Sequence, residues 1–261
     1  MAECQRLAEK AWLISERVPV DGRVSWIAPG TGVSEPYNQY LLEADERVLL
    51  VDTGVALHGP GLIAQLEPLI ENRRLIVYLT RIELDCIGNL AAILDRFPGT
   101  EVVTANPISP VSLVHRAKAG PIAVHHVAHS ADLSVVGFGH IRVIDPPIRT
   151  LGTSWLFDRR ARIVFTSDSI CAELAAGADS PTVRRDLVDP PDASRLRANI
   201  LAKFDWLAQA DRPSLLRRWD MVFDTLHPAV LAPIHGRPSC GEAVIESVLA
   251  SYRAALASCT S

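Results

Sequence analysis

The sequence predicts an α/β fold in which two mixed β-sheets lie between layers of helices, an αββα sandwich. Short apolar runs alternate with amphipathic helical patterns along the chain. Tight turns join some neighbouring strands and helices join others, which favours mixed sheets covered by helices. We find no internal repeat, linker or low-complexity segment, so we expect residues 1–261 to form a single domain.

The first part of the chain is predicted to form strands joined by turns. We expect strands at residues 11–14, 23–28, 37–43 and 47–51. The Gly-, Pro- and Ser-rich segment 29–36 and the residues 44–46 are the turns between them. The last of these strands ends in Asp52-Thr53-Gly54, and residues 59–71 follow with the apolar spacing of an amphipathic helix.

The most informative stretch is residues 76–89. The apolar run Leu75 to Leu79 indicates a buried strand, and it ends in the polar loop Arg81-x-Glu83-x-Asp85-Cys86. A helical pattern follows from about residue 89 to 97. Four side chains with possible chemistry therefore follow one strand at its carboxyl end, where α/β folds place their sites.

The second part of the chain repeats this arrangement twice. A hairpin formed by residues 154–157 and 163–165 leads into Asp168, and a short strand at 230–234 ends in His235-Gly236. We expect an irregular excursion at 172–190 and helices at about 109–118, 192–210, 213–224 and 240–256.

Composition excludes several classes of partner. The chain is 48% apolar and 21% charged, as is usual for a soluble globular protein, and its net charge is −4. It has no basic footprint for nucleic acid, no polybasic patch for a membrane surface and no apolar run of about 18 residues for a membrane span. The N-terminus has no signal-peptide pattern, and the five cysteines are scattered, which is typical of free thiols. We therefore expect a cytoplasmic protein without nucleic-acid or membrane partners.

The loop at residues 81–86 resembles the metal-binding loop of the metallo-β-lactamase superfamily, His-x-His-x-Asp-His. It is closer to the flavodiiron form of that loop, His-x-Glu-x-Asp-His: Glu83 and Asp85 match, whereas Arg81 and Cys86 stand at histidine positions. Residues 38–54 resemble the opening hairpin of the same fold. The resemblance covers roughly residues 10–255 and implies an αββα sandwich of the metallo-β-lactamase type and a homodimer.

The resemblance also implies where the other metal ligands would stand. Asp168 matches the bridging aspartate, His235 matches the final histidine, and Arg149 stands at the position of a middle histidine. The first iron would use the positions of Arg81, Glu83, Arg149 and Asp168. A protonated guanidinium has no lone pair to donate, so we expect no di-iron centre, and we expect ion pairs from the arginines to Glu83 and Asp168.

The second metal position keeps four side chains that can coordinate, namely Asp85, Cys86, Asp168 and His235. Carboxylate, thiolate and imidazole together suit a single zinc or ferrous ion. In the alternative, the carboxylates pair with the arginines and Cys86 is a small buried residue. No flavodoxin-like domain follows, so no bound flavin is expected.

Three hypotheses for function follow from these residues. In the first, the protein has lost di-metal redox chemistry and is a ligand-binding or regulatory module, whose pocket of Arg81, Arg149 and Glu83 receives a small anionic molecule. In the second, it is an enzyme with a remodelled site: a mononuclear hydrolase or oxidoreductase, or a metal-independent catalyst in which Asp85, Cys86 or His235 acts as base or nucleophile on an anionic substrate. The third, a working di-iron reductase of oxygen or nitric oxide, is disfavoured by the two arginines.

Overall fold

The computed structural model describes residues 2–19, 34–110, 120–148, 152–171, 182–187 and 191–259. The predicted strand at 23–28, most of the predicted helix at 109–118 and Arg149 lie outside these ranges, as does most of the predicted excursion at 172–190.

In the part of the chain that the structure describes, the first sheet contains seven strands that follow one another in chain order. They are β1 (Glu3–Ala8), β2 (Ala11–Pro19), β3 (Ser34–Glu43), β4 (Arg47–Val51), β5 (Arg74–Leu79), β6 (Glu101–Thr104) and β7 (Val124–His126). The pairs from β1 to β4 are antiparallel, and those from β4 to β7 are parallel. Strands β4, β5, β6 and β7 therefore all end at the same edge of the sheet.

Within the described ranges, the second sheet has six strands in the order β13-β12-β11-β10-β9-β8. They are β8 (Asp132–Leu133), β9 (Phe138–Ile144), β10 (Trp155–Asp158), β11 (Ile163–Ser167), β12 (Val230–Pro233) and β13 (Ser239–Cys240), with a 3-10 turn η3 (Ser134–Val136) between β8 and β9. Only β11 and β12 are parallel among these pairs, so their carboxyl ends lie side by side.

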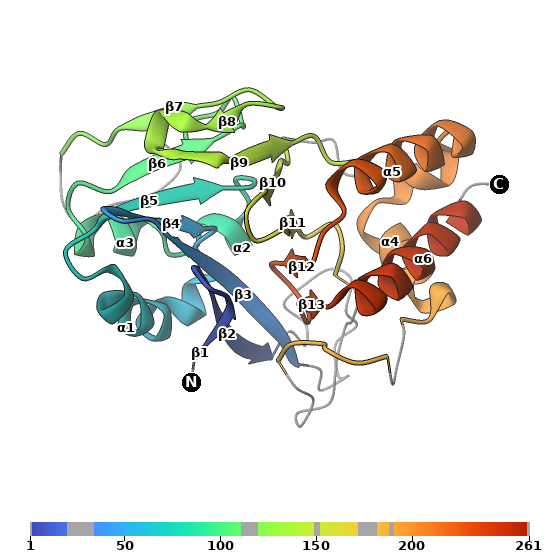
Figure 1. Cartoon of the computed structure of the whole chain (residues 1–261), viewed down its shortest axis with the longest axis horizontal. Coiled ribbons are helices and arrows are strands. Elements are labelled where there is room, and N and C mark those ends of the chain that lie inside the picture. The colour runs from blue at the N-terminus through green and yellow to red at the C-terminus, as the bar shows by residue number, and fades with distance from the viewer. Residues whose placement is uncertain are drawn as a thin grey trace.

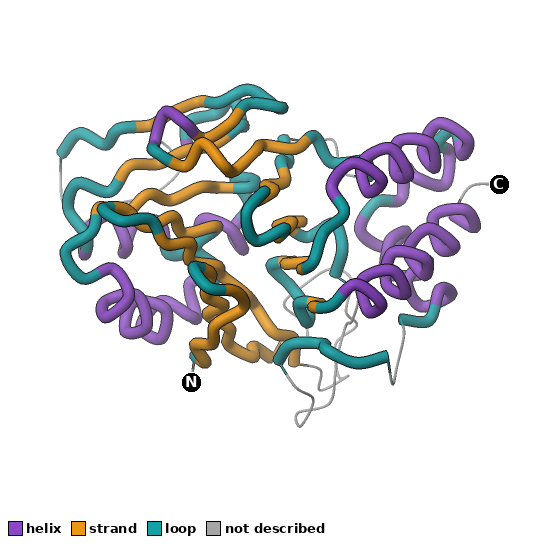
Figure 2. Tube along the Cα trace, in the orientation of Figure 1, coloured by secondary structure: helices purple, strands orange, loops and turns teal. Residues whose placement is uncertain are grey.

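Helices cover the outer faces of both sheets (Figures 1 and 2). Those on the first sheet are η1 (Ala56–His58), α1 (Gly59–Ile70), α2 (Leu84–Ile87) and α3 (Leu90–Arg96). Those on the second are α4 (Ala193–Lys203), η4 (Asp205–Gln209), α5 (Arg212–Leu226) and α6 (Glu242–Cys259). None of the helices in the described part of the chain combines the length and apolarity that a membrane span needs.

The alternation of side chains along each strand produces three apolar clusters. On β5, Ile76 and Tyr78 belong to the cluster between the sheets, whereas Val77 belongs to the cluster under α1, α2 and α3. On β11, Phe165 likewise faces the first sheet and Val164 faces the cluster under α4, α5 and α6. Both strands are buried on two faces, which explains why they read as continuous apolar runs.

The predicted αββα sandwich is confirmed, with differences in its elements. Strand β1 was not predicted, because it is an edge strand whose residues are exposed or half-buried and it therefore lacks an apolar run. The predicted helix at 89–97 is preceded by the single turn α2, which begins inside the polar loop at Leu84. The predicted helix at 192–210 is divided into α4 and η4 at Phe204, whose backbone is not helical.

Candidate functional site

The candidate site lies where the two sheets meet at the carboxyl ends of their parallel strands. Asp52 follows β4, Arg81 follows β5, Asp168 follows β11 and His235 lies just beyond β12. The sheets are joined here through Asn38 of β3, whose side-chain amide donates to the carbonyl oxygens of Pro233 at 2.9 Å and Gly236 at 2.7 Å. Residues from four regions of the sequence are thereby brought to one place.

Arg81 is the centre of the site. Its side chain is only 2% exposed and forms ion pairs with Asp85 and Asp168. Its Nε donates to Cys86 Sγ at 3.3 Å, and Nη1 lies 3.9 Å from the carboxylate of the more exposed Glu83. Burial by itself would lower the pKa of Arg81, but Asp168 and Asp85 raise it well above its ordinary value, so the guanidinium stays charged.

His235 lies on the other side of Asp85. Its Nε2 is 2.7 Å from Asp85 Oδ2, the same carboxylate oxygen that pairs with Arg81. The Tyr37 ring meets the imidazole edge-on at 4.4 Å between centroids. Burial raises the pKa of Asp85, but Arg81 and the hydrogen bond from His235 outweigh it and hold that pKa well below its usual range. Asp85 is therefore an ionised carboxylate held between two basic groups.

Glu35 is a site residue that the sequence analysis missed. It is fully buried, and its carboxylate lies 3.8 Å from His235 Nδ1. Neither carboxylate oxygen has a hydrogen-bond partner within the described ranges. Residues 29–36 were predicted as a turn, whereas β3 begins at Ser34. A lone carboxylate at the start of a strand that is otherwise almost wholly buried is the signal that could have identified it.

Asp52 completes the buried acidic residues at this end of the sheets. Its carboxylate accepts hydrogen bonds from the backbone N–H of Thr80 at 2.9 Å and from the Thr80 hydroxyl at 2.7 Å. Burial raises the pKa of Asp52 to about 7, despite these two hydrogen bonds. Its backbone lies in the left-handed region, with φ 60°, a conformation that aspartate tolerates better than most residues.

Gly88 allows α2 to approach the loop after β4. A Cβ atom at this position would lie 2.6 Å from the carbonyl oxygen of Gly54. The close approach lets Thr53 donate to the Cys86 carbonyl oxygen from both its N–H and its hydroxyl, each at 2.7 Å. Asp85 and Cys86 are thus positioned by the loop that carries Asp52.

The cysteines of the site are buried thiols. Cys86 is fully buried, and burial together with Asp52 raises its pKa well above the ordinary value, although Arg81 lowers it. Burial raises the pKa of Cys171 to about 12, and its thiol donates to the Asp168 carbonyl oxygen at 3.2 Å. Neither thiol is placed to form a thiolate at neutral pH.

The structure therefore brings together Arg81, Asp85, Cys86, Asp168 and His235, with Glu83 at the edge. As arranged, these residues do not fit a metal ion at the position of the guanidinium, because Arg81 itself lies between Asp85 and Asp168. Among the residues that the structure describes, no three His, Cys, Asp or Glu side chains are grouped so that they could hold a metal ion. The predicted contribution of Arg149 lies outside the described residues.

Comparison with known proteins gives the fold its name. No family model matches the chain, and no curated protein matches it. Among solved structures, rubredoxin oxygen:oxidoreductase from Desulfovibrio gigas superimposes with a TM-score of 0.73 at 16% identity, over 96% of this chain and 61% of that one. The flavodiiron protein from Giardia intestinalis gives 0.69 at 15% identity, over 97% and 59%.

A metallo-β-lactamase from Pontibacter korlensis is also similar, with a TM-score of 0.59 at 15% identity over 96% of this chain and 98% of that one. The chain spans about three-fifths of the length of the proteins from Desulfovibrio gigas and Giardia intestinalis. Structural similarity at such low identity shows the fold only, and any function has to be argued from the residues of the site. The chain has the metallo-β-lactamase fold, in a form similar to that of flavodiiron proteins.

Proposed function

We propose that this protein is a binding or regulatory module with a flavodiiron-like fold, in which Arg81 replaces a metal ion as the positive charge of the site. The observation that carries the proposal is the buried guanidinium between Asp85 and Asp168, two positions that resemble metal ligands. A guanidinium is fixed to the chain and cannot change its oxidation state or accept a ligand's lone pair. In this proposal the protein keeps the fold, but its site does not support di-metal redox chemistry.

We do not extend the predicted anionic ligand to Arg81. Arg81 is only 2% exposed and is already surrounded by carboxylates, so an incoming anion would have to compete with Asp85 and Asp168. Anion binding therefore remains a proposal for Arg149, outside the described residues, and does not extend to Arg81.

Metal content tests the proposal. Protein purified without chelators is to be analysed by mass spectrometry for iron and zinc, as wild type, Arg81→His and Arg81→Gln. We expect far less than one ion per chain in the wild type. Arg81→His removes the fixed charge and adds an imidazole beside Asp85, Asp168 and His235, so it should gain zinc, whereas Arg81→Gln removes the charge without adding a ligand and should not. One or more retained iron or zinc ions per wild-type chain would overturn the proposal.

Two forms of the enzyme alternative, a thiolate nucleophile at Cys86 and a mononuclear metal held by Asp85, Cys86, Asp168 and His235, can be tested at the Cys86 thiol. Alkylation of wild-type protein with iodoacetamide, followed peptide by peptide, separates these cases, and the half-buried Cys4 serves as an internal control. We expect Cys86 to react slowly with and without a chelator, because it is buried and its pKa is raised. Faster reaction after chelation would indicate a metal-bound thiolate, and fast reaction in both conditions would indicate an activated nucleophile.

A further inference from the structure

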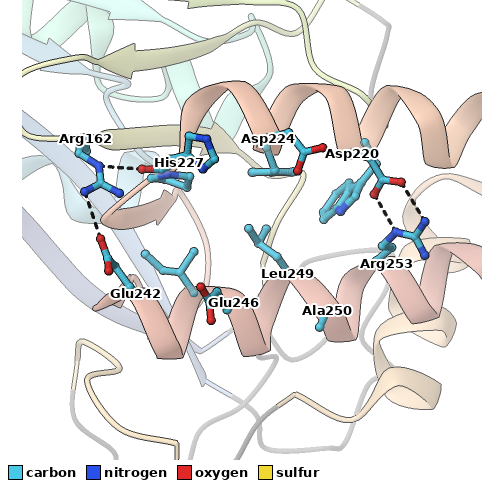
Figure 3. A pocket seen from close by; sticks show the side chains of 13 residues that line it. Arg162, Asp220, Asp224, His227, Glu242, Glu246, Leu249, Ala250 and Arg253 are labelled. Atoms are coloured by element: carbon cyan, nitrogen blue, oxygen red, sulfur yellow. Dashed lines mark hydrogen bonds and ion pairs between the residues drawn. The ribbon is translucent and has the colours of Figure 1, made fainter.

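A groove lies on the opposite side of the second sheet from the candidate site, between the antiparallel helices α5 and α6 (Figure 3). It has a volume of about 490 Å³, within the range of ligand-binding clefts. Its floor is apolar: Phe223 and Ile245 are buried, and Leu249 is half-buried between the two helices. The function proposed above makes no use of this surface.

Ion pairs close both ends of the groove. At one end, Arg162 donates to the carbonyl oxygen of His227 at 2.8 Å and to Glu242 at 3.1 Å. At the other, Arg253 forms two hydrogen bonds with Asp220, at 2.7 and 2.8 Å. These contacts join the end of α5 to the start of α6, and the middle of α5 to the later part of α6.

The walls of the groove carry uncompensated negative charge. Asp224 on α5 and Glu246 on α6 stand on opposite sides of the floor (Figure 3). Within the described ranges, neither side chain makes an ion pair or a hydrogen bond, whereas Asp220 and Glu242 are neutralised by the arginines at the ends. A ligand complementary to this groove would have an apolar surface that contacts the floor and positive charges that face Asp224 and Glu246.

We propose that the α5–α6 groove is a docking site for a basic amphipathic helix of a partner protein. The apolar face of that helix would pack on Leu249, which lies above the buried Phe223, and its flanking lysine or arginine side chains would pair with Asp224 and Glu246. Docking of an amphipathic helix into an apolar groove is a common mode of recognition between proteins. The two unpaired carboxylates would repel an acidic helix, so the partner helix is expected to be basic.

The probe is a model peptide of about 15 leucine and lysine residues with a helical period, long enough to form a helix on binding. Its binding to the whole chain is to be measured by calorimetry and by amide chemical shifts. We expect the shifts to be concentrated on α5 and α6, and we expect the double variant Asp224→Asn/Glu246→Gln to bind at least about fivefold more weakly at low salt. Leu249→Gln should weaken binding independently of salt, since it changes only the floor.

The matched control is Glu9→Gln/Glu46→Gln, which removes two exposed carboxylates from the turns of the first sheet and should bind as the wild type does. Equal weakening by both double variants would show general attraction to an acidic protein and would overturn the proposal. It would also fail if the peptide did not bind, if a peptide with glutamate in place of lysine bound as well, or if sedimentation showed that a second copy of the chain covers the groove.

Discussion

Asp52 is fully buried after strand β4, whereas Asp85, whose side chain is 13% exposed, lies beyond the neighbouring parallel strand β5, and their pKa values are shifted in opposite directions. Burial raises the pKa of both carboxyl groups. Among the described residues, only Thr80 donates hydrogen bonds to the Asp52 carboxylate, and the pKa of Asp52 remains raised at about 7. Asp85 lies beside Arg81 and His235, and its pKa falls well below the usual range.

The difference shows that neutral donors and fixed cations are not equivalent partners for a buried carboxylate. Two hydrogen bonds reduce the cost of ionising Asp52 without removing it, whereas a guanidinium a few ångströms away reverses the preference of Asp85. At this end of the sheets, the charge of Arg81 therefore keeps Asp85 ionised. Three substitutions test this difference: one removes the charge of Arg81, one removes the titrating proton of Asp52, and one breaks an arginine–aspartate pair that is exposed.

Removing the charge should have the largest effect. Arg81→Met leaves Asp85 and Asp168 buried without their guanidinium, and loss of one partner of a buried ion pair costs about 3–5 kcal/mol. We expect a loss of that size in the free energy of unfolding, measured by urea titration. The control is Arg81→Met/Asp168→Asn, which removes one of the stranded charges and should recover part of the loss. A loss below about 1 kcal/mol would place the network in the class of exposed ion pairs.

Changing the proton on Asp52 should have the next largest effect. Its folded pKa of about 7 exceeds the value of about 3.9 expected for an unfolded chain, so between these values the folded state holds a proton that the unfolded state releases. Its contribution to stability is therefore fully present below pH 4 and is lost as the pH rises to about 7, at no more than about 1.4 kcal/mol per pH unit.

Asp52→Asn is the matched control for this pH dependence. Asparagine keeps the acceptor for the Thr80 N–H and tolerates the left-handed backbone at this position, so the variant should fold. We expect urea titrations from pH 4 to 8 to show a downward slope in the wild type that is reduced in the variant. Parallel profiles would mean that Asp52 is ionised throughout this range.

The sequence was sufficient for the fold and for much of this contrast. Apolar runs identified the buried strands, and the polar loop after Leu79 placed Arg81 beside Asp85 and Cys86. The resemblance of Asp168 and His235 to ligand positions of the metallo-β-lactamase fold indicated that they would meet that loop. Glu35 escaped notice, because a carboxylate beside a proline in a polar segment looks like part of an exposed turn. The raised pKa of Asp52 could not be predicted from the sequence either, because it depends on burial and on which neighbouring groups carry charge.

The smallest effect on stability should come from an arginine–aspartate pair at the surface, Arg253 and Asp220. Arg253 and Asp220 are joined by two hydrogen bonds, at 2.7 and 2.8 Å, but their side chains are 48% and 38% exposed. Water screens the attraction and solvates each partner after the other is removed. We expect the urea midpoint of Arg253→Gln to equal that of the wild type within experimental error. We also expect the difference between the two midpoints to stay the same when salt is added. A loss comparable to that of Arg81→Met would show that bidentate geometry, and not burial, determines how strongly an arginine–aspartate pair stabilises this fold.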